Sequence, residues 1–298
     1  MVKVSVIIPS FGRPGFLKKS VYSVLKQTFV EWELIIVDDN GKGTPSQIQT
    51  AKVLAEFLAD SRIRYFIQEE NKGGSAARNA GWKMASGHYI CFLDNDDEFY
   101  PEKLEQQYRL LDKSDYQMTV CGFDSFKKGV KVRSSPQIPN YEQYLIPFAQ
   151  GLINFASGST LMVSKSLLEK VNGYDEEFRR KQDVELMIRL LRVEKLLVDP
   201  NRLVKLNIDD RSNIPSVEDF RRFQALFQSK FRDLFTEFPH KDQDQIQQYQ
   251  LIELAKVALW NKNMSLFFTQ LFNRKMSVKN KIHLTFDLSR KFITYYLK

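Results

Sequence analysis

The sequence predicts an α/β protein: a mostly parallel sheet flanked by helices, followed by a helical C-terminal extension. In the first hundred residues, four apolar runs of strand length alternate with stretches of helical length, which is typical of βαβ units. From Val217 onwards the chain instead reads as helical and is richer in Phe and Gln. Because 43% of its 298 residues are hydrophobic, the chain can bury the core of one large domain and a smaller appendage.

The four expected strands of the first hundred residues are Val4–Pro9, Leu34–Val37, Ile63–Ile67 and Tyr89–Leu93. The expected helices between them run from about Gly15 to Lys26, from Thr44 onwards, and from the Gly73-Gly74 pair through Met84. Thr44 can cap the second helix, Pro45 suits its first position, and Gln47 completes a capping box.

Beyond Pro101 the pattern loosens, although further elements are expected. They are a helix at Pro101–Leu111, a strand at Met118–Phe123, a strand at Thr160–Val163 and a helix at Asp183–Leu191, with an irregular stretch before Gly151. The change in composition near Pro215 divides the chain into a domain of residues 1–215 and a helical region of residues 216–298.

Composition argues against several classes of protein. No apolar run approaches the roughly 20 residues of a membrane-spanning helix, and no signal peptide is visible before the first strand. Cys91 and Cys121 lie in apolar, strand-like runs, so we expect buried free thiols rather than a disulfide or a metal pair. The three histidines lack zinc-ligand spacing. We therefore expect a reducing, cytoplasmic compartment.

The net charge of +8 is concentrated at the C-terminal end. Residues 273–298 carry seven basic side chains against the single acid Asp287, which leaves the body of the chain close to neutral. The body therefore gives no reason to expect nucleic acid as a partner.

The sharpest local feature is a cluster of four acids, Asp94, Asp96, Asp97 and Glu98. Like charges this close repel each other, so a fold that keeps them together usually supplies a cation. Carboxylate oxygens favour magnesium or manganese, which also bind phosphates. The alternative is a solvated loop leading into the helix after Pro101, since acidic side chains favour helix starts.

Polar residues also follow two other strands. Pro9-Ser10-Phe11 closes the first strand and Asp38-Asp39 closes the second. Because parallel sheets bind ligands at the carboxyl ends of their strands, we expect these residues and the acidic cluster to converge on one crevice. Gly73-Gly74 could add backbone amides for a phosphate, although such glycines are also common in ordinary turns.

Seven short segments, spread in order over roughly the first 200 residues, carry a family resemblance. They are Val4–Phe11, Ser20–Phe29, Glu33–Asn40, Asn71–Gly81, Phe92–Asp97, Gly173–Glu176 and Gln182–Leu186. They resemble the motifs of the family 2 glycosyltransferases. The resemblance implies the Rossmann-like GT-A fold, with a nucleotide-binding half at about residues 1–100 and an acceptor half at about residues 101–215.

The resemblance also implies a nucleotide-sugar donor site. Its positions would be Pro9, Ser10, Phe11, Asp39, Asn71, Arg78, Asp94 and Asn95, and Arg211 is a further candidate that the family pattern does not supply. Phe11 matches an aromatic residue against the base, and Asp39 matches a carboxylate that reads the base's imide edge. Asp94 would face the ribose, while Asp96 would ligate Mn²⁺ or Mg²⁺, a Lewis acid for the departing diphosphate.

The resemblance makes Asp183 the catalytic base that removes a proton from the acceptor hydroxyl. Gln182 stands where many relatives have Glu, a variant that leaves the base itself unchanged. Read from the residues alone, Asp183 could simply cap the helix that follows it.

The segment after Leu203 departs from the family pattern. Many relatives place a His there, ahead of a Ser, near the metal or the diphosphate, and this chain has none. Arg211 could neutralise the diphosphate instead, or Asp209 or Asp210 could supplement the metal. A surface loop is the default interpretation.

The expected activity is inverting transfer of a sugar from a nucleotide donor, with a uridine diphosphate sugar as leading candidate, to a hydroxyl of a polysaccharide or glycoconjugate. One alternative is a sugar-nucleotide-binding module without catalysis, which the presence of Asp96 and Asp183 disfavours. Another is a sugar-nucleotide pyrophosphorylase, which the segment Ser10–Gly15 disfavours because it lacks that class's Gly-rich spacing.

The chain from Lys281 onwards can be drawn as an amphipathic helix, with Ile282 and Phe286 on its apolar side and cations along the border. Such a helix suits an anionic membrane surface, here the inner face of the plasma membrane. It equally suits docking on the protein itself or on a second copy in a homo-oligomer.

Overall fold

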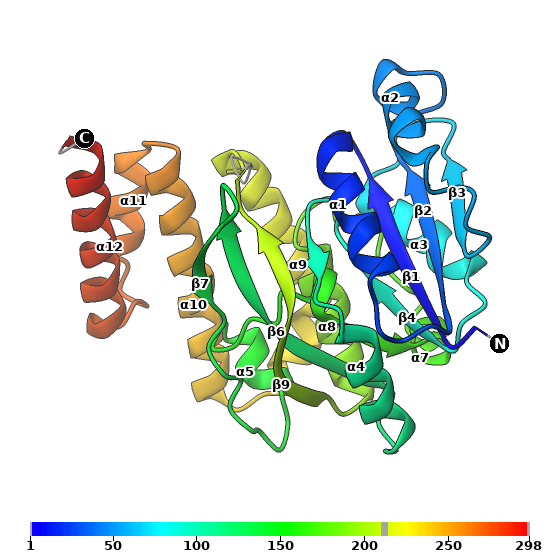
Figure 1. Cartoon of the computed structure of the whole chain (residues 1–298). Coiled ribbons are helices and arrows are strands. Elements are labelled where there is room, and N and C mark those ends of the chain that lie inside the picture. Colours follow the sequence, from blue (N-terminus) through cyan, green and yellow to red (C-terminus); the bar gives the residue numbers. More distant parts are fainter. Residues whose placement is uncertain (1, 210–213, 297–298) are drawn as a thin grey trace. The chain divides into compact units, whose positions relative to one another are not determined.

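The structure is a computed structural model that describes residues 2–209 and 214–296. The chain forms two compact units (Figure 1). The first comprises residues 1–145 and 154–209, and the second comprises residues 146–153 and 210–298. The sequence placed a boundary near Pro215 and did not anticipate that residues 146–153 group with the C-terminal helices.

The first unit is built on one sheet of nine strands within the described residues. The strands are β1 (Val4–Ser10), β2 (Trp32–Asp38), β3 (Ile63–Ile67), β4 (Tyr89–Phe92), β5 (Glu98–Phe99), β6 (Met118–Lys127), β7 (Val130–Ser134), β8 (Met162–Ser164) and β9 (Leu197–Asn207). Their order is β3-β2-β1-β4-β8-β6-β9-β5, with β7 paired to β6. Strands β3, β2, β1 and β4 are parallel, whereas β8 joins β4 and β6 in antiparallel pairs.

Helices flank this sheet. They are α1 (Pro14–Leu25), α2 (Pro45–Leu54), α3 (Gly74–Met84), α4 (Lys103–Asp112), α6 (Ser157–Thr160), α7 (Lys165–Lys170) and α8 (Gln182–Val193), while α5 (Leu145–Ala149) spans the division between the units. The elements expected in the first hundred residues are confirmed, with the parallel arrangement that the βαβ pattern predicts.

The later part of the first unit differs from the sequence expectation. The stretch read as irregular contains β7, and the expected strand at Thr160–Val163 begins only at Met162, because Thr160 ends α6. Strand β9 was not expected at all. Pro200 interrupts its apolar alternation, and the sheet accommodates this with register shifts where β9 pairs with β6.

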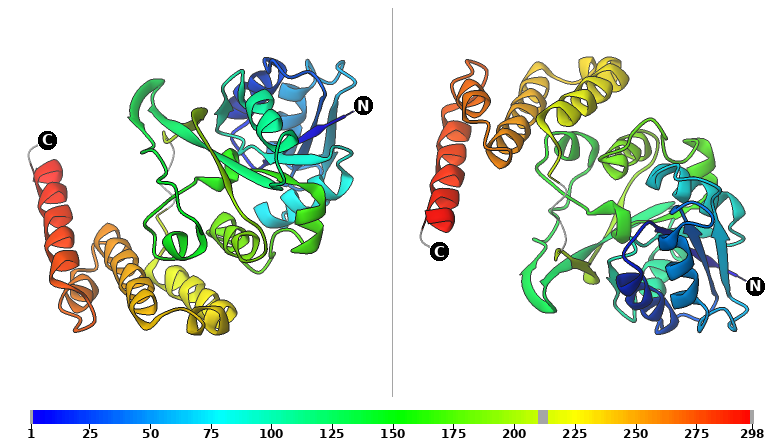
Figure 2. Two further views of the ribbon diagram at one scale, coloured as in Figure 1. Left: turned by 90° about the horizontal axis from the view of Figure 1, so that it is seen from below. Right: turned by 90° about the horizontal axis from the view of Figure 1, so that it is seen from above.

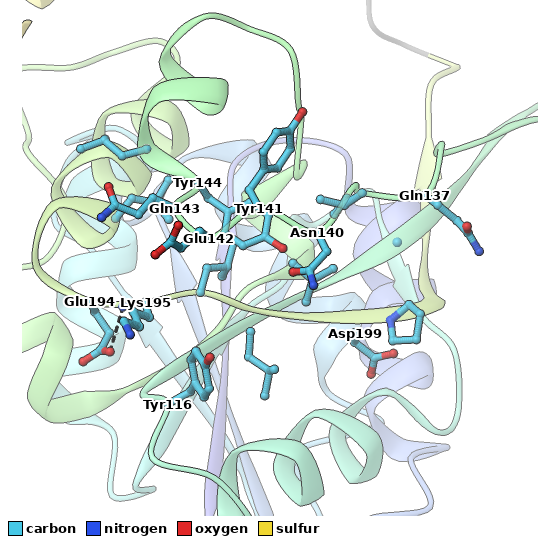
Figure 3. Close-up of a pocket in the computed structure, with 18 of the residues that line it drawn as sticks. Tyr116, Gln137, Asn140, Tyr141, Glu142, Gln143, Tyr144, Glu194, Lys195 and Asp199 are labelled. Atoms are coloured by element: carbon cyan, nitrogen blue, oxygen red, sulfur yellow. Dashed lines mark hydrogen bonds between the residues drawn. The ribbon is translucent and has the colours of Figure 1, made fainter. Parts of the chain in front are cut away.

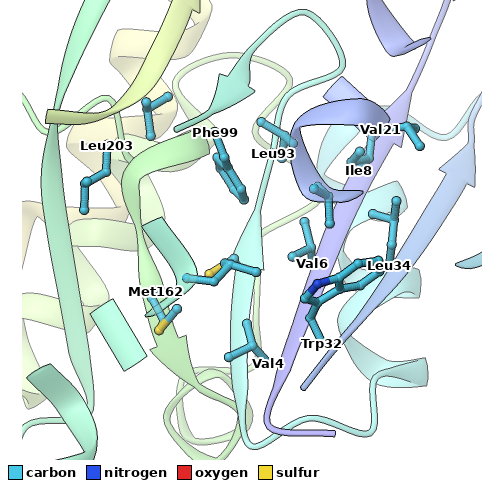
Figure 4. Packing of buried hydrophobic residues seen from close by; sticks show 14 of the residues in the cluster. Val4, Val6, Ile8, Val21, Trp32, Leu34, Leu93, Phe99, Met162 and Leu203 are labelled. Carbon is cyan, nitrogen blue, oxygen red and sulfur yellow. The ribbon is translucent and has the colours of Figure 1, made fainter. Parts of the chain in front are cut away.

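The apolar core lies along the central strands whose carboxyl ends carry the expected site residues. Strand β1 is buried along nearly its whole length, and its neighbour β2 is buried completely. Figure 4 shows part of the core cluster, where side chains of β1, β2, α1 and the later strands meet. Cys91 and Cys121 are buried free thiols, as expected from their apolar surroundings.

Helix α3 lies unusually close to the sheet at Gly81. A Cβ atom built on Gly81 would stand 2.3 Å from Cγ2 of Ile7 in β1, and 3.4 Å from Cγ2 of Val37 in β2. Glycine at this position therefore lets α3 pack directly on the two central strands.

The second unit is helical within its described residues. Its helices are α9 (Val217–Thr236), α10 (His240–Trp260), α11 (Met264–Leu271) and α12 (Val278–Tyr296). Helix α10 contacts the other three (Figure 2). Leu284 of α12 is buried in a small core with Phe267 and Met276, whereas Ile282 and Phe286 are exposed. None of the helices, as far as they are described, is long and apolar enough to cross a membrane.

We predict that Gly81→Ala lowers the free energy of unfolding by about 1–3 kcal/mol, because the added methyl group overlaps Ile7 in a packed core. Gly15→Ala is the matched control, since Gly15 lies in α1 with nothing within 4 Å of an added Cβ. That control should be neutral or stabilise by up to about 1 kcal/mol. Urea denaturation measures both, and a Gly81→Ala variant as stable as the wild type would contradict the close packing.

Candidate functional site

A cleft of about 370 Å³ lies at the carboxyl ends of β1, β2 and β4. Its lining residues are Pro9, Ser10, Phe11, Asp39, Asn71, Gly73, Gly74, Ala77, Arg78, Asp94, Asn95 and Asp96. The structure therefore brings together every donor and metal position expected from the sequence except Arg211. That residue lies outside the described residues, as does Asp210.

Asp39 is buried at the base of the cleft and holds the loop before α3. Its carboxylate accepts hydrogen bonds from the Asn71 side chain at 3.0 Å and from the backbone N–H groups of Lys72 and Gly73 at 2.7 and 2.9 Å. Burial raises the pKa of Asp39, and the two backbone donors and the charge of Arg179 oppose that rise. Asp39 thus stabilises the loop carrying Asn71 as well as lining the cleft.

The loop between β1 and α1 forms another wall. The Phe11 side chain is 62% exposed and is therefore available as a flat apolar surface. The backbone N–H of Gly12 donates to Asn40 Oδ1 at 2.8 Å, and Asn95 Nδ2 donates to the Gly12 carbonyl at 3.3 Å. Ser10 Oγ is buried with no hydrogen-bond partner among the described atoms. These contacts link the Phe11 loop to the acidic loop.

Asp94 is paired with Arg78 of α3. Arg78 Nη2 donates to Asp94 Oδ1, Nη1 donates to Gln182 Oε1 at 2.9 Å, and the guanidinium lies 5.4 Å from the Tyr174 ring centroid. Burial alone would lower the pKa of Arg78, but the charge of Asp94 raises it above its ordinary value. A Cβ on Gly158 would stand 3.0 Å from Asp94 Oδ2, so this glycine permits the close approach. The Arg78 side chain is thus a cation fixed in the cleft, and only 12% of it is exposed.

Asp96 forms an ion pair with Arg13 at the start of α1, with Nη1 to Oδ2 at 2.7 Å. The two side chains are 32% and 19% exposed, so the pair borders solvent. No group of three or more His, Cys, Asp or Glu side chains that could hold a metal is found in the part of the chain that the structure describes.

Asp96, the expected ligand, nevertheless fits a divalent cation, and Asp94 lies in the same cleft. They offer hard oxygen ligands that line the same cleft. Magnesium-type sites commonly use one or two carboxylates and complete their coordination with substrate phosphates and water. Asp94 and Asp96 therefore suit a cation that arrives together with a diphosphate.

Asp97 is fully buried and has a structural environment. Its Oδ2 accepts from Ser159 Oγ at 2.7 Å, and its Oδ1 accepts from the backbone N–H of Asn207 at 3.1 Å. The backbone carbonyl of Asp97 accepts from Ser20 Oγ at 2.7 Å. Asp97 therefore ties the acidic loop to α6, to the end of β9 and to α1.

Asp183 lies at the second position of α8 and is near the cleft without lining it. Burial raises its pKa, the charge of Asp94 adds to that rise, and Arg78 opposes it. The carboxylate also accepts hydrogen bonds from the backbone N–H groups of Val184 and of Asp183 itself, which lower the pKa. Asp183 therefore interacts with the helix start and also lies within electrostatic reach of Asp94.

Two motif residues prove to be supports for this region. Asn79 holds the turn before α8, because its side chain donates to the Tyr174 carbonyl and to Glu176, each at 2.8 Å. Glu185 is buried and paired with Arg189, which also donates to the Gly173 carbonyl at 2.7 Å. The segments 78–79 and 182–185 are thus joined through one turn.

Several residues near the cleft escaped the sequence analysis. Arg13 pairs with Asp96, Ser159 bridges Asp94 and Asp97, and Arg179 donates to the Lys72 carbonyl at 2.8 Å. The basic run Arg179-Arg180-Lys181 directly precedes Gln182 and would have been a signal. Ser159 has no such signal, because its role depends on a contact across the fold. Asp209, considered as an extra metal ligand, accepts from the Lys128 backbone N–H.

A larger cavity of about 860 Å³ lies at the other end of β6 and β9. It contains none of the expected site residues. Figure 3 shows Tyr116, Asn140, Tyr141 and Asp199 among its lining residues. Asp199 is buried, and its Oδ2 has no hydrogen-bond partner among the described atoms. A choice of functional site by cavity volume alone would therefore miss the cleft that contains the expected site residues.

The chain belongs to the glycosyl transferase family 2, whose family model matches residues 5–171. It is therefore a glycosyltransferase. An uncharacterized glycosyltransferase of Rickettsia typhi is 28% identical over 242 residues, covering 78% of this chain and 72% of that protein. A Rickettsia felis relative matches similarly over 39% of its own length. The Escherichia coli UDP-Glc:alpha-D-GlcNAc-diphosphoundecaprenol beta-1,3-glucosyltransferase WfgD is 32% identical over 191 residues, covering 63% of this chain and 70% of that protein.

Solved structures show the same fold at low sequence identity. Residues 1–349 of S. aureus TarS in complex with UDP-GlcNAc superpose with a TM-score of 0.62 at 16% identity, covering 97% of this chain and 92% of that chain. The mannosyltransferase PcManGT from Pyrobaculum calidifontis, in complex with GDP-Man and Mn²⁺, gives a TM-score of 0.59 at 14% identity, covering 99% and 81%. The fold is thus the GT-A fold expected from the sequence.

We predict that Asp183→Asn lowers the turnover number by about 10²- to 10⁴-fold if Asp183 is the general base. Because the pKa of Asp183 is raised, activity should be lost as pH falls through a value above the ordinary 3.8 of Asp. Arg78→Gln should move this acid limb to higher pH, since the guanidinium lowers the pKa of Asp183.

The readout is the pH profile of kcat/KM, normalised to each variant's own maximum. Lys83→Gln is the matched control, because it removes one positive charge from an exposed position on the same helix. An acid limb that stays in place, or moves to lower pH, in Arg78→Gln would argue against Asp183 as the base.

Proposed function

We propose that this enzyme transfers a sugar from a nucleoside diphosphate donor to an acceptor hydroxyl in one inverting displacement assisted by a divalent cation. The observation that carries the proposal is the convergence of an exposed aromatic ring, a buried arginine and two loop carboxylates in one cleft, with Asp183 close by. Each group matches one requirement of that reaction.

The base of the donor would stack on Phe11 and be read by Asp39. A carboxylate has about four lone-pair sites, and three donors from the 71–73 loop already use Asp39. One acceptor position is therefore left for a base N–H. A uracil imide N–H would supply that donor, which favours a uridine nucleotide.

Relatives give the same preference for the base without settling it. The E. coli relative is named for UDP-Glc, and the S. aureus TarS structure contains UDP-GlcNAc. The Pyrobaculum structure instead contains GDP-Man. A UDP-sugar is therefore the first donor to test, and a saccharide chain or glycoconjugate is the acceptor class that we propose.

Asp96 would hold Mn²⁺ or Mg²⁺ against the diphosphate, and Asp94, in the same cleft, would face the ribose. A divalent cation in that place neutralises the charge that develops on the leaving group. Arg78 contributes a second, permanent positive charge at the donor side, and Asn95 keeps the acidic loop against the Phe11 loop. We propose that Arg211 also places a positive charge against the diphosphate.

Asp183 would take the proton of the acceptor hydroxyl. A raised pKa suits this role, because a base is most effective when its pKa approaches the working pH. The hydroxyl then attacks the anomeric carbon, and the bond between that carbon and the diphosphate breaks. Inversion follows because attack and departure occur on opposite faces of the sugar.

We predict that one or more UDP-sugars in a screen of sugar nucleotides release nucleoside diphosphate in the presence of Mn²⁺. Asp96→Asn should lower release by at least about tenfold, because it removes a metal ligand whose charge the cation requires. Asp115→Asn is the control, since Asp115 is an exposed carboxylate outside the cleft. The assay is direct measurement of released diphosphate.

The outcomes separate the competing functions. Binding of UDP without release from any donor, tried with acceptor glycans, would favour a binding module without catalysis. Formation of a sugar nucleotide from a sugar phosphate and nucleoside triphosphate would favour a pyrophosphorylase. Full activity of Asp96→Asn would remove Asp96 from the proposed metal site.

We also propose that α12 brings the enzyme to an anionic membrane surface, the inner face of the plasma membrane for a cytoplasmic enzyme. Val278, Ile282 and Phe286 recur at four-residue intervals on α12 and are 72%, 65% and 59% exposed. Exposed Lys275 and Lys279 lie beside them in the sequence. Apolar side chains bordered by cations favour binding to anionic lipid.

We predict that the protein co-sediments with vesicles containing phosphatidylglycerol and much less with vesicles of phosphatidylcholine alone. The double variant Ile282→Ser/Phe286→Ser should reduce the bound fraction several-fold, because each exposed apolar side chain contributes to burial in the interface. Val130→Ser is the control, as Val130 is 65% exposed on β7 in the other unit.

Unchanged co-sedimentation of the double variant would exclude this surface as the membrane contact. Loss of a dimer in sedimentation velocity, with no vesicle binding by the wild type, would instead assign the same apolar residues to a homo-oligomer.

A further inference from the structure

We propose that Arg13 is a built-in competitor of the divalent cation at Asp96, so that metal binding is strengthened when Arg13 leaves this carboxylate for the diphosphate of the donor. The inference rests on the proposed function, in which Asp96 is a metal ligand. Arg13 lies outside the motifs that carry the family resemblance. Its exchange between Asp96 and the diphosphate would make metal binding and donor binding depend on each other.

Arg13 is bound directly to the carboxylate that would hold the metal. Arg13 Nη1 stands 2.7 Å from Asp96 Oδ2, the distance of a direct charge-assisted hydrogen bond. A magnesium-type cation binds a carboxylate oxygen at about 2.0–2.1 Å. A guanidinium and a divalent cation on the same carboxylate would repel each other strongly at that separation. Binding of one therefore weakens binding of the other.

The backbone at Arg13 has an unusual conformation. Arg13 has φ 52° and ψ 48°, a left-handed conformation that non-glycine residues rarely adopt, and the preceding Gly12 also has a positive φ of 60°. Such outliers gather at functional sites, where the surrounding structure holds them in place. Here Asn40 accepts from the Gly12 N–H and Asn95 donates to the Gly12 carbonyl. The chain is thus held in the turn that leads to Arg13.

Arg13 lies in the same loop as a residue of the proposed donor site. Phe11, the proposed stacking surface for the base, is two residues before Arg13 in the same loop. Arg13 is 32% exposed and long enough to move between partners at the rim of the cleft. A diphosphate held against Asp96 would offer the guanidinium new anionic oxygens. The donor should therefore draw Arg13 away from Asp96 and strengthen metal binding there.

The test measures Mn²⁺ binding directly, by electron paramagnetic resonance of free Mn²⁺, with and without UDP and with no sugar transfer involved. Arg13→Gln keeps a non-glycine residue at the strained position and removes the charge. Arg13→Lys keeps the charge. Lys18→Gln is the matched control, because it removes one positive charge from the same helix at an exposed position paired with Glu56. Asp96→Asn supplies the baseline.

Without UDP, Arg13→Gln should bind Mn²⁺ about three- to tenfold more tightly than the wild type, the range expected when a partly exposed ion pair and its repulsion of the metal are removed. Arg13→Lys should stay close to the wild type, and Lys18→Gln should change by less than about twofold. UDP should tighten Mn²⁺ binding more in the wild type than in Arg13→Gln, because coupling between two ligands is lost with the residue that links them.

Equal or weaker Mn²⁺ binding by Arg13→Gln without UDP would overturn the inference. An equal tightening by UDP in both proteins would overturn the link to the donor. If Asp96→Asn binds Mn²⁺ as well as the wild type does, the proposed metal site itself is wrong, and this result is distinguishable because it does not involve Arg13. Thermal melting of each variant checks that the fold is retained.

Discussion

The buried carboxylate of Asp97 is the contact on which the site depends. It accepts hydrogen bonds from Ser159 and from the backbone of Asn207, while its own carbonyl accepts from Ser20. Those partners belong to α6, the end of β9 and α1, which are far apart in the sequence. Because a buried carboxylate is costly unless its hydrogen bonds are satisfied, the three elements and the acidic loop must assemble together. The orientation of Asp94 and Asp96 then follows from a neighbour that does not line the cleft.

Charge compensation explains how several acids coexist beside that anchor. Asp94 is paired with buried Arg78, Asp96 with Arg13, and Asp39 with backbone donors and the field of Arg179. These contacts differ in how easily they can be exchanged. The Arg78 side chain is only 12% exposed and the backbone amides are fixed in the fold, whereas Arg13 borders solvent. Among the described residues, Arg78 thus supplies a largely inaccessible positive charge in the cleft, and Arg13 supplies a solvent-bordering one beside it.

The sequence was a good guide wherever function and strand ends coincide. The alternation of strands and helices predicted β1 to β4, and their carboxyl ends predicted which residues share the cleft. Strand β9 escaped because Pro200 breaks its pattern, and pairing with β6 compensates for the break only in the folded chain. Ser159 and Arg13 escaped for a related reason. Their partners lie 62 or more residues away, and local patterns carry no information about such contacts.

Opposing interactions act on the pKa of Asp183. Its place at the start of α8 favours a charged, capping carboxylate, because helix amides lower its pKa. Burial beside Asp94 acts in the opposite direction and outweighs those amides, so the pKa is raised. A helix start that only needed a cap would gain nothing from a neighbouring like charge. The charge of Asp94 therefore disfavours the ionised form of Asp183, and shifted pKa values of this kind are common among carboxylates at functional sites.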